Sequence, residues 1–85
     1  MFARTLRQQR EAQKIGVREL AARLSIDPSY LSKIERSALP PPRPKRIREL
    51  AKALHADVNE LLAAAALDRL PSTARARLLD MAASF

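Results

Sequence analysis

Residues 17–36 read Val-Arg-Glu-Leu-Ala-Ala-Arg-Leu-Ser-Ile-Asp-Pro-Ser-Tyr-Leu-Ser-Lys-Ile-Glu-Arg, a stretch that predicts two short helices meeting at a fixed corner. The prediction rests on apolar residues at three- and four-residue spacing, which is the repeat of one helix face. They form two stripes, at Leu20, Ala21 and Leu24 and then at Leu31 and Ile34. Both stripes can face one core, so the two helices are expected to pack against each other.

The corner between these helices is marked by Asp27 and Pro28. Asp27 can accept hydrogen bonds from the free N–H groups of a first helical turn, and a proline at the first helical position removes no donor that the helix needs. The second helix is therefore expected to begin near Pro28. The small residue of the corner is Ser25 rather than glycine, so a left-handed backbone there is expected to be strained.

The motif Glu-Leu-Ala-x-x-Leu at residues 19–24, followed by Ile-Asp-Pro-Ser-Tyr-Leu-Ser-Lys-Ile-Glu-Arg at residues 26–36, resembles the Cro/C1-type (XRE) helix-turn-helix DNA-binding domain. The resemblance spans residues 4–66 and implies an all-α, lambda-repressor-like fold that binds a specific duplex DNA sequence. It includes Leu6, Arg10 and the apolar residues that match the family's fourth and fifth helices: Ile47, Leu50, Ala51, Leu54, Val58, Leu61 and Leu62. The family's usual glycines, in the corner and after the second motif helix, are absent.

The whole chain is expected to be an all-α bundle of five to six helices with no strand. The first helix is expected to end before Gly16, the only glycine in the chain and a natural C-terminal cap. Later helices are expected over residues 17–24, 28–36, 44–55 and 57–67, with a sixth after Pro71. We interpret residues 1–68 as the helix-turn-helix domain and residues 69–85 as a C-terminal helix of the same single domain.

Charge is distributed unevenly along the chain, whose net charge is +7. Residues 1–52 hold 13 Lys and Arg against 5 Asp and Glu, whereas residues 53–85 hold 3 against 4. A basic half of this kind attracts a polyanion such as nucleic acid. There is no cysteine for disulfides or thiolate metal sites, no export leader, and no apolar run long enough to span a membrane. We therefore expect a cytoplasmic, nucleoid-associated protein without a membrane partner.

Base contacts are expected from the outward face of the second motif helix and from the start of the first. By the resemblance they are Val17, Pro28, Ser29 and Lys33, and the helical spacing adds Ser32 on the same outward face. Lys33 can donate to guanine O6 and N7, whereas Pro28 offers only apolar contact. Two alternatives stay open, because Lys33 can instead contact phosphate only and Ser29 can instead serve as a second helix cap.

Phosphate contacts are expected from basic residues around the motif and in the proline-rich loop that follows it, which prolines hold extended. The expected set is Arg10, Arg18, Tyr30, Arg36, Arg43, Lys45 and Arg46. The resemblance also implies an internal ion pair between Arg10 and Glu35. Arg10 would then brace the first helix against the second motif helix while its outer edge meets a phosphate.

Other classes of function have weaker support in the residues. The single histidine, His55, has no neighbouring catalytic or metal-binding partners in the sequence, so we expect no enzyme, no metal and no cofactor. An RNA-binding role lacks aromatic stacking residues other than Tyr30. We expect a repressor of a plasmid or phage type acting on an inverted-repeat operator. The alternative is an antitoxin that represses its own operon and binds a toxin, and a toxin or co-repressor partner stays open.

The C-terminal segment carries an apolar stripe that the five-helix core does not require. Its residues are Ala74, Leu78, Leu79, Met81, Ala82 and Phe85. Because one domain covers a single half-site, we expect a homodimer with its interface at Leu78, Leu79, Met81, Ala82 and Phe85. In the alternative, this helix folds back over Phe2 and Leu6.

Overall fold

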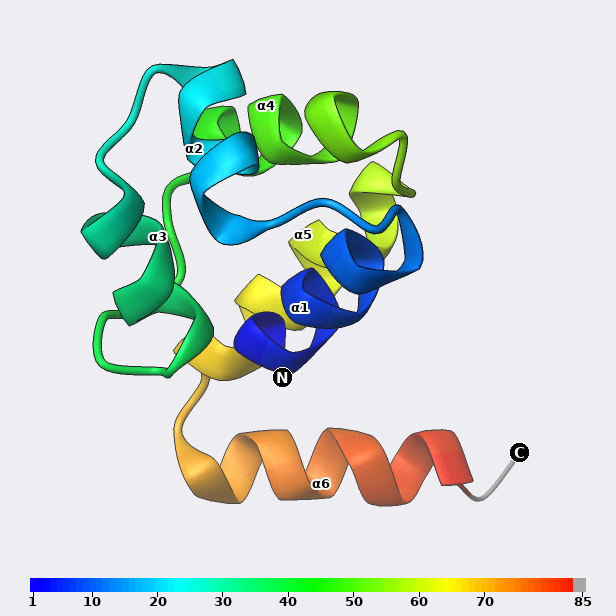
Figure 1. The fold of residues 1–85 in the computed structure, drawn as a ribbon. Helices are drawn as coiled ribbons and strands as arrows, with labels where there is room; N and C mark the ends of the chain where they lie inside the picture. Colours follow the sequence, from blue (N-terminus) through cyan, green and yellow to red (C-terminus); the bar gives the residue numbers. More distant parts are fainter. Residues whose placement is uncertain (84–85) are drawn as a thin grey trace.

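The computed structural model describes residues 1–83, which form six α-helices and no strand (Figure 1). Their bounds are α1 Phe2–Ala12, α2 Val17–Leu24, α3 Pro28–Glu35, α4 Pro44–Leu54, α5 Val58–Arg69 and α6 Ser72–Ala83. The expected all-α architecture is confirmed. Phe85, one of the expected interface residues, lies outside the described residues.

Helices α1 to α5 enclose one apolar core. Its largest fully buried side chains are Phe2, Leu6, Leu20, Leu31, Ile34, Ile47, Leu50, Leu54 and Leu61. Helix α5 packs against both α1 and α4, and it presents the small buried side chains of Ala64 and Ala65. Because alanine side chains are short, the backbones of neighbouring helices can approach α5 closely. Both apolar stripes of the α2–α3 motif face this core, as expected.

Local capping residues set the starts of α3 and α5. The Asp27 carboxylate accepts from the Ser29 N–H at 2.8 Å, and Pro28 is the first helical residue. The Asp57 carboxylate accepts from the Asn59 N–H at 2.9 Å in the same way. The expected start of the second motif helix is confirmed, because both signals are local and need no distant partner.

Four helix ends use a left-handed residue that is not glycine. These residues are Lys14, Ser25, Ser37 and His55, with φ between 52° and 60°. In each case the N–H of the following residue bonds to the carbonyl five residues earlier, which closes a Schellman motif. The residues that follow are Ile15, which is buried, Ile26 and Ala56, which pack against the core, and Ala38, which is exposed. Burial of an apolar residue just past the helix thus offsets the backbone strain at three of the four ends.

The expectation that Gly16 caps α1 is wrong. Helix α1 ends at Ala12, and its left-handed residue is Lys14. Because the chain turns at Lys14, the next residue, Ile15, is buried in the core. Gly16 is instead the extended N-terminal flanking residue of α2, with φ −75° and ψ 162°.

A buried ion pair fixes α3 against α1. Arg10 Nε donates to Glu35 Oε2 at 2.7 Å and Arg10 Nη2 donates to Glu35 Oε1 at 2.8 Å. The Glu35 side chain is 4% exposed and that of Arg10 is 13% exposed. Arg7 Nη2 also donates to the Glu35 carbonyl oxygen at 3.0 Å. The ion pair implied by the resemblance is therefore present, and it orients the C-terminal end of α3.

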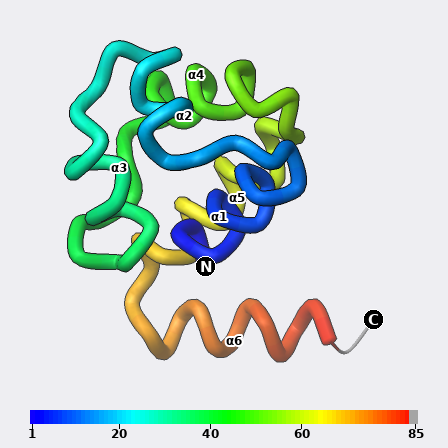
Figure 2. The backbone as a smooth tube through the Cα atoms, viewed as in Figure 1, coloured from blue at the N-terminus to red at the C-terminus, as the bar shows by residue number. Residues whose placement is uncertain are grey.

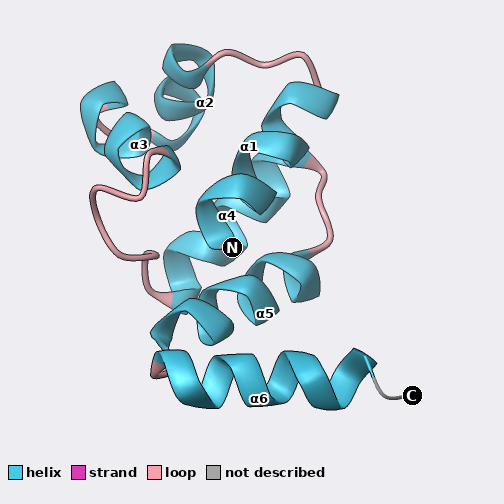
Figure 3. Ribbon diagram, turned by 90° about the horizontal axis from the view of Figure 1, so that it is seen from below, coloured by secondary structure: helices cyan, strands magenta, loops and turns pink. Residues whose placement is uncertain are grey.

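Helix α6 lies at the edge of the bundle, after Leu70 and Pro71 (Figure 3). None of its residues up to Ala83 is buried. Phe2 and Leu6 are fully buried, yet α6 contributes no buried side chain over them. Ala74 and Arg75 are half-buried, however, and Arg75 lines a pocket together with Phe2, so the alternative in which this helix folds back over the core stays a prediction.

Replacing Ser25 by glycine is expected to stabilise the fold. A left-handed residue that is not glycine costs about 1–2 kcal/mol, whereas glycine costs about 0.4–1 kcal/mol through the freedom it adds to the unfolded chain. The free energy of unfolding measured with urea should therefore rise by about 0.5–1 kcal/mol in Ser25→Gly. Ala22→Gly, in the exposed interior of α2, is the control and should lose about 1 kcal/mol. A loss of stability in Ser25→Gly would contradict the strain argument.

Replacing Arg10 by methionine is expected to destabilise the fold strongly. The change keeps an apolar stem but leaves the buried Glu35 carboxylate without its main partner. Such a loss costs about 3–5 kcal/mol, and urea unfolding followed by circular dichroism measures it. Arg4→Met, at an exposed arginine of the same helix, should stay within about 0.5 kcal/mol of the unchanged protein. Equal effects of the two changes would show that the pair does not hold α3.

Candidate nucleic-acid interface

Helix α3 lies at the left edge of the molecule (Figure 1), and several of its polar residues are exposed. Pro28, Ser29 and Lys33 are exposed there, and Ser32 is half-buried. Val17, the expected base contact at the start of α2, is half-buried and packs against the core. The structure thus brings four of the five expected base-contact residues onto one accessible helix, with Val17 recessed beside it.

Ser29 has a local role in addition to any contact with a ligand. Its hydroxyl donates to Asp27 Oδ1 at 2.9 Å, beside the N–H bond that caps α3. Hydrogen bonds from the Ser29 backbone and then from its hydroxyl lower the pKa of the Asp27 carboxyl. The Ser29 hydroxyl thus supports the cap residue Asp27 and does not itself bond to a backbone N–H of α3. Its hydroxyl has committed its one hydrogen and keeps only acceptor capacity for a base.

Arg10 is largely occupied inside the protein. Besides its two bonds to Glu35, its Nη1 donates to the Ile15 carbonyl oxygen at 2.8 Å. The hydrogen bond with Glu35 raises the pKa of the Arg10 guanidinium against the opposing effect of burial. Three of its five N–H donors are thus used internally, and two of them join α1 to α3 through Glu35. A phosphate contact by its outer edge stays a prediction.

Four of the expected phosphate contacts meet around one open groove. Tyr30 of α3 lines it together with Arg43, Lys45 and Arg46. Leu39 and the prolines at 40–42 also line the groove, which holds about 550 Å³. Glu49 also lines the groove, and its Oε2 lies 3.7 Å from Arg46 Nη1. The groove therefore combines three cations, partly offset by one carboxylate, beside the C-terminal half of the motif.

The remaining two expected phosphate contacts lie elsewhere on the surface. Arg18 is exposed in the first turn of α2, and Arg36 is exposed at the C-terminal end of α3. Gly16 supplies no side-chain hydrogen bond to the first turn of α2. The N–H groups of that turn are thus not capped from within the chain, which is the arrangement that favours an anion.

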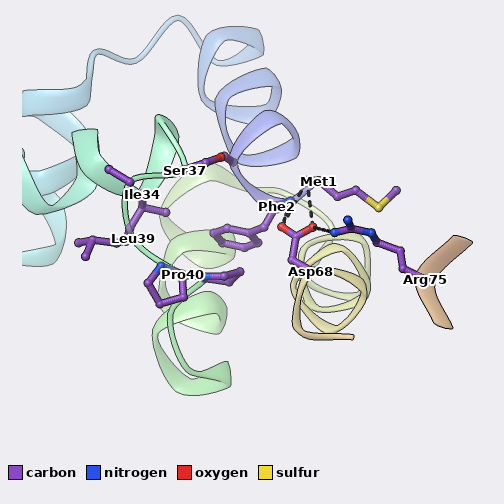
Figure 4. Close-up of a pocket in the computed structure, with 11 residues that line it drawn as sticks. Met1, Phe2, Ile34, Ser37, Leu39, Pro40, Asp68 and Arg75 are labelled. Atoms are coloured by element: carbon purple, nitrogen blue, oxygen red, sulfur yellow. Dashed lines mark hydrogen bonds and ion pairs between the residues drawn. The ribbon is translucent and has the colours of Figure 1, made fainter. Parts of the chain in front are cut away.

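Two adjacent residues at the end of α5, Asp68 and Arg69, have roles that the sequence analysis missed. The Asp68 carboxylate accepts from the Phe2 N–H at 2.8 Å and from the Met1 amino group at 3.0 Å (Figure 4). It also forms an ion pair with Arg75 of α6 at 3.7 Å. Burial raises the pKa of the Asp68 carboxyl, but these donors outweigh that effect and lower it overall.

Arg69 points toward the proline-rich loop. Its Nη2 donates to the carbonyl oxygen of Pro41 at 3.2 Å and also to that of Pro42. No spacing rule identifies this pair, because the partners lie 27 and 28 residues apart in the chain. The signal available in the sequence was the proline run itself, which lacks N–H donors and so needs donors from elsewhere.

Among residues 1–83, no group of three His, Asp or Glu side chains is arranged to hold a metal ion. Within the same residues, no helix combines the length and the apolar character needed to cross a bilayer.

Comparisons with known proteins agree with this geometry. A family model described as a helix-turn-helix domain matches residues 1–65. An uncharacterized HTH-type transcriptional regulator of Bacillus subtilis (strain 168), RghRB, is 38% identical over 64 residues, which is 75% of this chain and 46% of that protein. The match therefore spans about half the length of this relative. No solved structure matches the chain.

The family match confirms the helix-turn-helix resemblance predicted from the sequence. It includes all of α1 to α4 and most of α5. Since the matched region contains the α2–α3 corner and the core that supports it, this protein belongs to the helix-turn-helix domain family.

Proposed function

We propose that this protein binds a specific duplex DNA sequence through α3 and regulates transcription, most simply by repression at an inverted-repeat operator. The observation that carries the proposal is the exposed polar face of α3 beside a groove lined by Arg43, Lys45 and Arg46. A helix of this width fits the major groove, and cations beside it fit the flanking phosphates. The name of RghRB as a transcriptional regulator agrees with this role.

Lys33 is the main base-reading residue in this proposal. It is the long polar side chain on the exposed face of α3, and it can donate to guanine O6 and N7. Ser29 reads as an acceptor, since its hydroxyl hydrogen is committed to Asp27. Such an acceptor pairs with the amino groups of adenine or cytosine. Pro28, Ser32 and Val17 add apolar or short polar contacts at the margin.

Phosphates on two sides hold α3 in register. On one side, the groove of Tyr30, Arg43, Lys45 and Arg46 lies along the backbone. On the other side, Arg18 and the uncapped first turn of α2 receive a phosphate. Arg36 and the outer edge of Arg10 complete the set. A protein with this partner acts in the cytoplasm at the nucleoid, and occlusion of a promoter requires only tight binding.

The second copy needed for an inverted repeat pairs through α6 in this proposal. Leu78 and Leu79 are each 44% exposed, and Met81 is 52% exposed. They lie on one side of α6 with Ala82, and α6 buries no described residue of its own. An isologous contact between two such helices covers this face and sets the spacing of the two α3 helices, about 34 Å on B-DNA.

An antitoxin role is the second candidate, and the same exposed face favours it. In that case Leu78, Leu79 and Met81 contact a toxin protein, while α3 still binds the operator. A homodimer of the isolated protein that is sensitive to changes on this face supports the first candidate over the second.

A matched pair of lysine substitutions distinguishes contacts with bases from contacts with phosphates. Lys33→Ala should cost about 1–3 kcal/mol on the cognate site, selected from randomised duplexes, and much less on random DNA. Lys45→Ala should weaken both equally and reduce the slope of log K against log salt by about one unit. Fluorescence anisotropy at several salt concentrations measures both. Equal losses on both DNAs for Lys33→Ala would show that Lys33 contacts phosphate only.

The dimer is tested by charge placed on α6. Leu78→Asp combined with Met81→Asp should convert the dimer to a monomer at micromolar concentration and abolish cooperative operator binding. Thr73→Asp combined with Ala76→Asp is the control, since these exposed residues lie on the opposite side of the same helix. Sedimentation velocity measures the assembly. A monomeric unchanged protein, or a folded Leu78→Asp/Met81→Asp variant that is still dimeric, would reject this interface.

A further inference from the structure

The proline stretch in the loop between α3 and α4 has no backbone N–H donor of its own. Residues 40–42 are all proline, and another proline follows at position 44. Proline has no N–H, so this segment can be held only through its carbonyl oxygens or by side-chain packing. The Pro42 side chain is buried, which anchors one point of the loop. Its backbone direction still depends on a donor from another element.

Arg69 supplies that donor. Its guanidinium, at the C-terminal end of α5, donates to two successive carbonyls, those of Pro41 and Pro42. Figure 2 shows the loop passing close to this end of α5. Arg69 also lines an open groove of about 520 Å³ together with Arg43 and Pro44. It therefore acts on the two residues that directly precede Arg43, and Lys45 follows shortly afterwards in the first turn of α4.

We infer that Arg69 is a positioning residue for DNA binding, which holds the proline-rich loop so that Arg43 and Lys45 meet the DNA backbone. The inference rests on the proposed function and adds to it a residue outside the α2–α3 motif. A loop fixed in advance does not lose conformational freedom on binding, so its phosphate contacts retain their full strength. Without Arg69 the two carbonyls lose this donor, and the DNA itself must order the loop that carries Arg43 and leads into the first turn of α4 with Lys45.

The opposite possibility is that Arg69 contacts a phosphate directly. Its side chain is exposed, but the N–H groups of Nη2 are directed at the two proline carbonyls. The two roles differ in how the effect of replacing Arg69 on DNA affinity combines with the effect of replacing Lys45. A direct contact adds its effect to that of Lys45, whereas a positioning residue loses its effect once the side chain that it positions is gone.

The test is a double-mutant cycle on the full chain with duplex DNA carrying the selected operator. Arg69→Ala should weaken binding about tenfold, the scale of a lost charge-assisted hydrogen bond. In a chain that already carries Arg43→Ala and Lys45→Ala, the same change should weaken binding by less than about threefold. Arg77→Ala, at an exposed arginine of α6, removes the same charge and should change the affinity by less than about twofold.

A second readout does not depend on DNA. The NMR order parameters of the Leu39 and Arg43 backbone N–H groups in the free protein should fall in Arg69→Ala, while that of the α4 residue Leu50 should not change. If no duplex binds the unchanged protein but the order parameters of the loop still fall in Arg69→Ala, the proposed function fails and the holding role of Arg69 stands. Additive effects in the cycle, or unchanged order parameters at Leu39 and Arg43, would overturn the inference.

Discussion

The orientation of α3 depends on the buried pair between Arg10 and Glu35. A helix of eight residues is not stable in isolation, so its position has to come from tertiary contacts. Glu35 also lies at the C-terminal end of α3, where the helix dipole disfavours a carboxylate. The two guanidinium groups from α1 reverse that penalty, one by a bidentate contact and the other by binding the Glu35 carbonyl. The acidic residue thus binds α3 to α1 instead of weakening it.

Helix α3 and the proline-rich loop, both on the proposed DNA side, are each held by arginine side chains from another element. Arg7 and Arg10 of α1 hold the end of α3, and Arg69 of α5 holds the loop that follows. Asp68, next to Arg69, binds the start of α1 and reaches Arg75 of α6. The end of α5 is therefore a junction at which the chain start, the proline-rich loop and α6 meet.

The parts of this structure that the sequence predicts are those set by residues close together in the chain. Asp27-Pro28, Pro44 and Asp57 mark helix starts within a few residues, and the structure follows them. The end of α1 was predicted wrongly, because Lys14 takes the left-handed conformation that glycine usually supplies when the next residue, Ile15, is buried. That preference depends on the finished core, which the local sequence does not contain.

The candidate site also divides into features that depend on local sequence and features that depend on distant contacts. The outward face of α3 came from helical spacing, and the grouping of Tyr30 with Arg43, Lys45 and Arg46 agrees with the expected phosphate set. Asp68 and Arg69 were not predicted, since their partners are set by how α5 passes the loop and the chain start. Ser29 had two readings, and only three-dimensional geometry could show that its hydroxyl bonds to Asp27.

The proline-rich loop also affects the tendency of the protein to aggregate at high concentration. It is an extended, exposed segment that carries the exposed side chain of Leu39, and such segments usually invite pairing with a strand from another molecule. Strand pairing needs alternating donors and acceptors, and three successive prolines offer acceptors only. The loop can therefore stay open to a polyanion without serving as a template for aggregation.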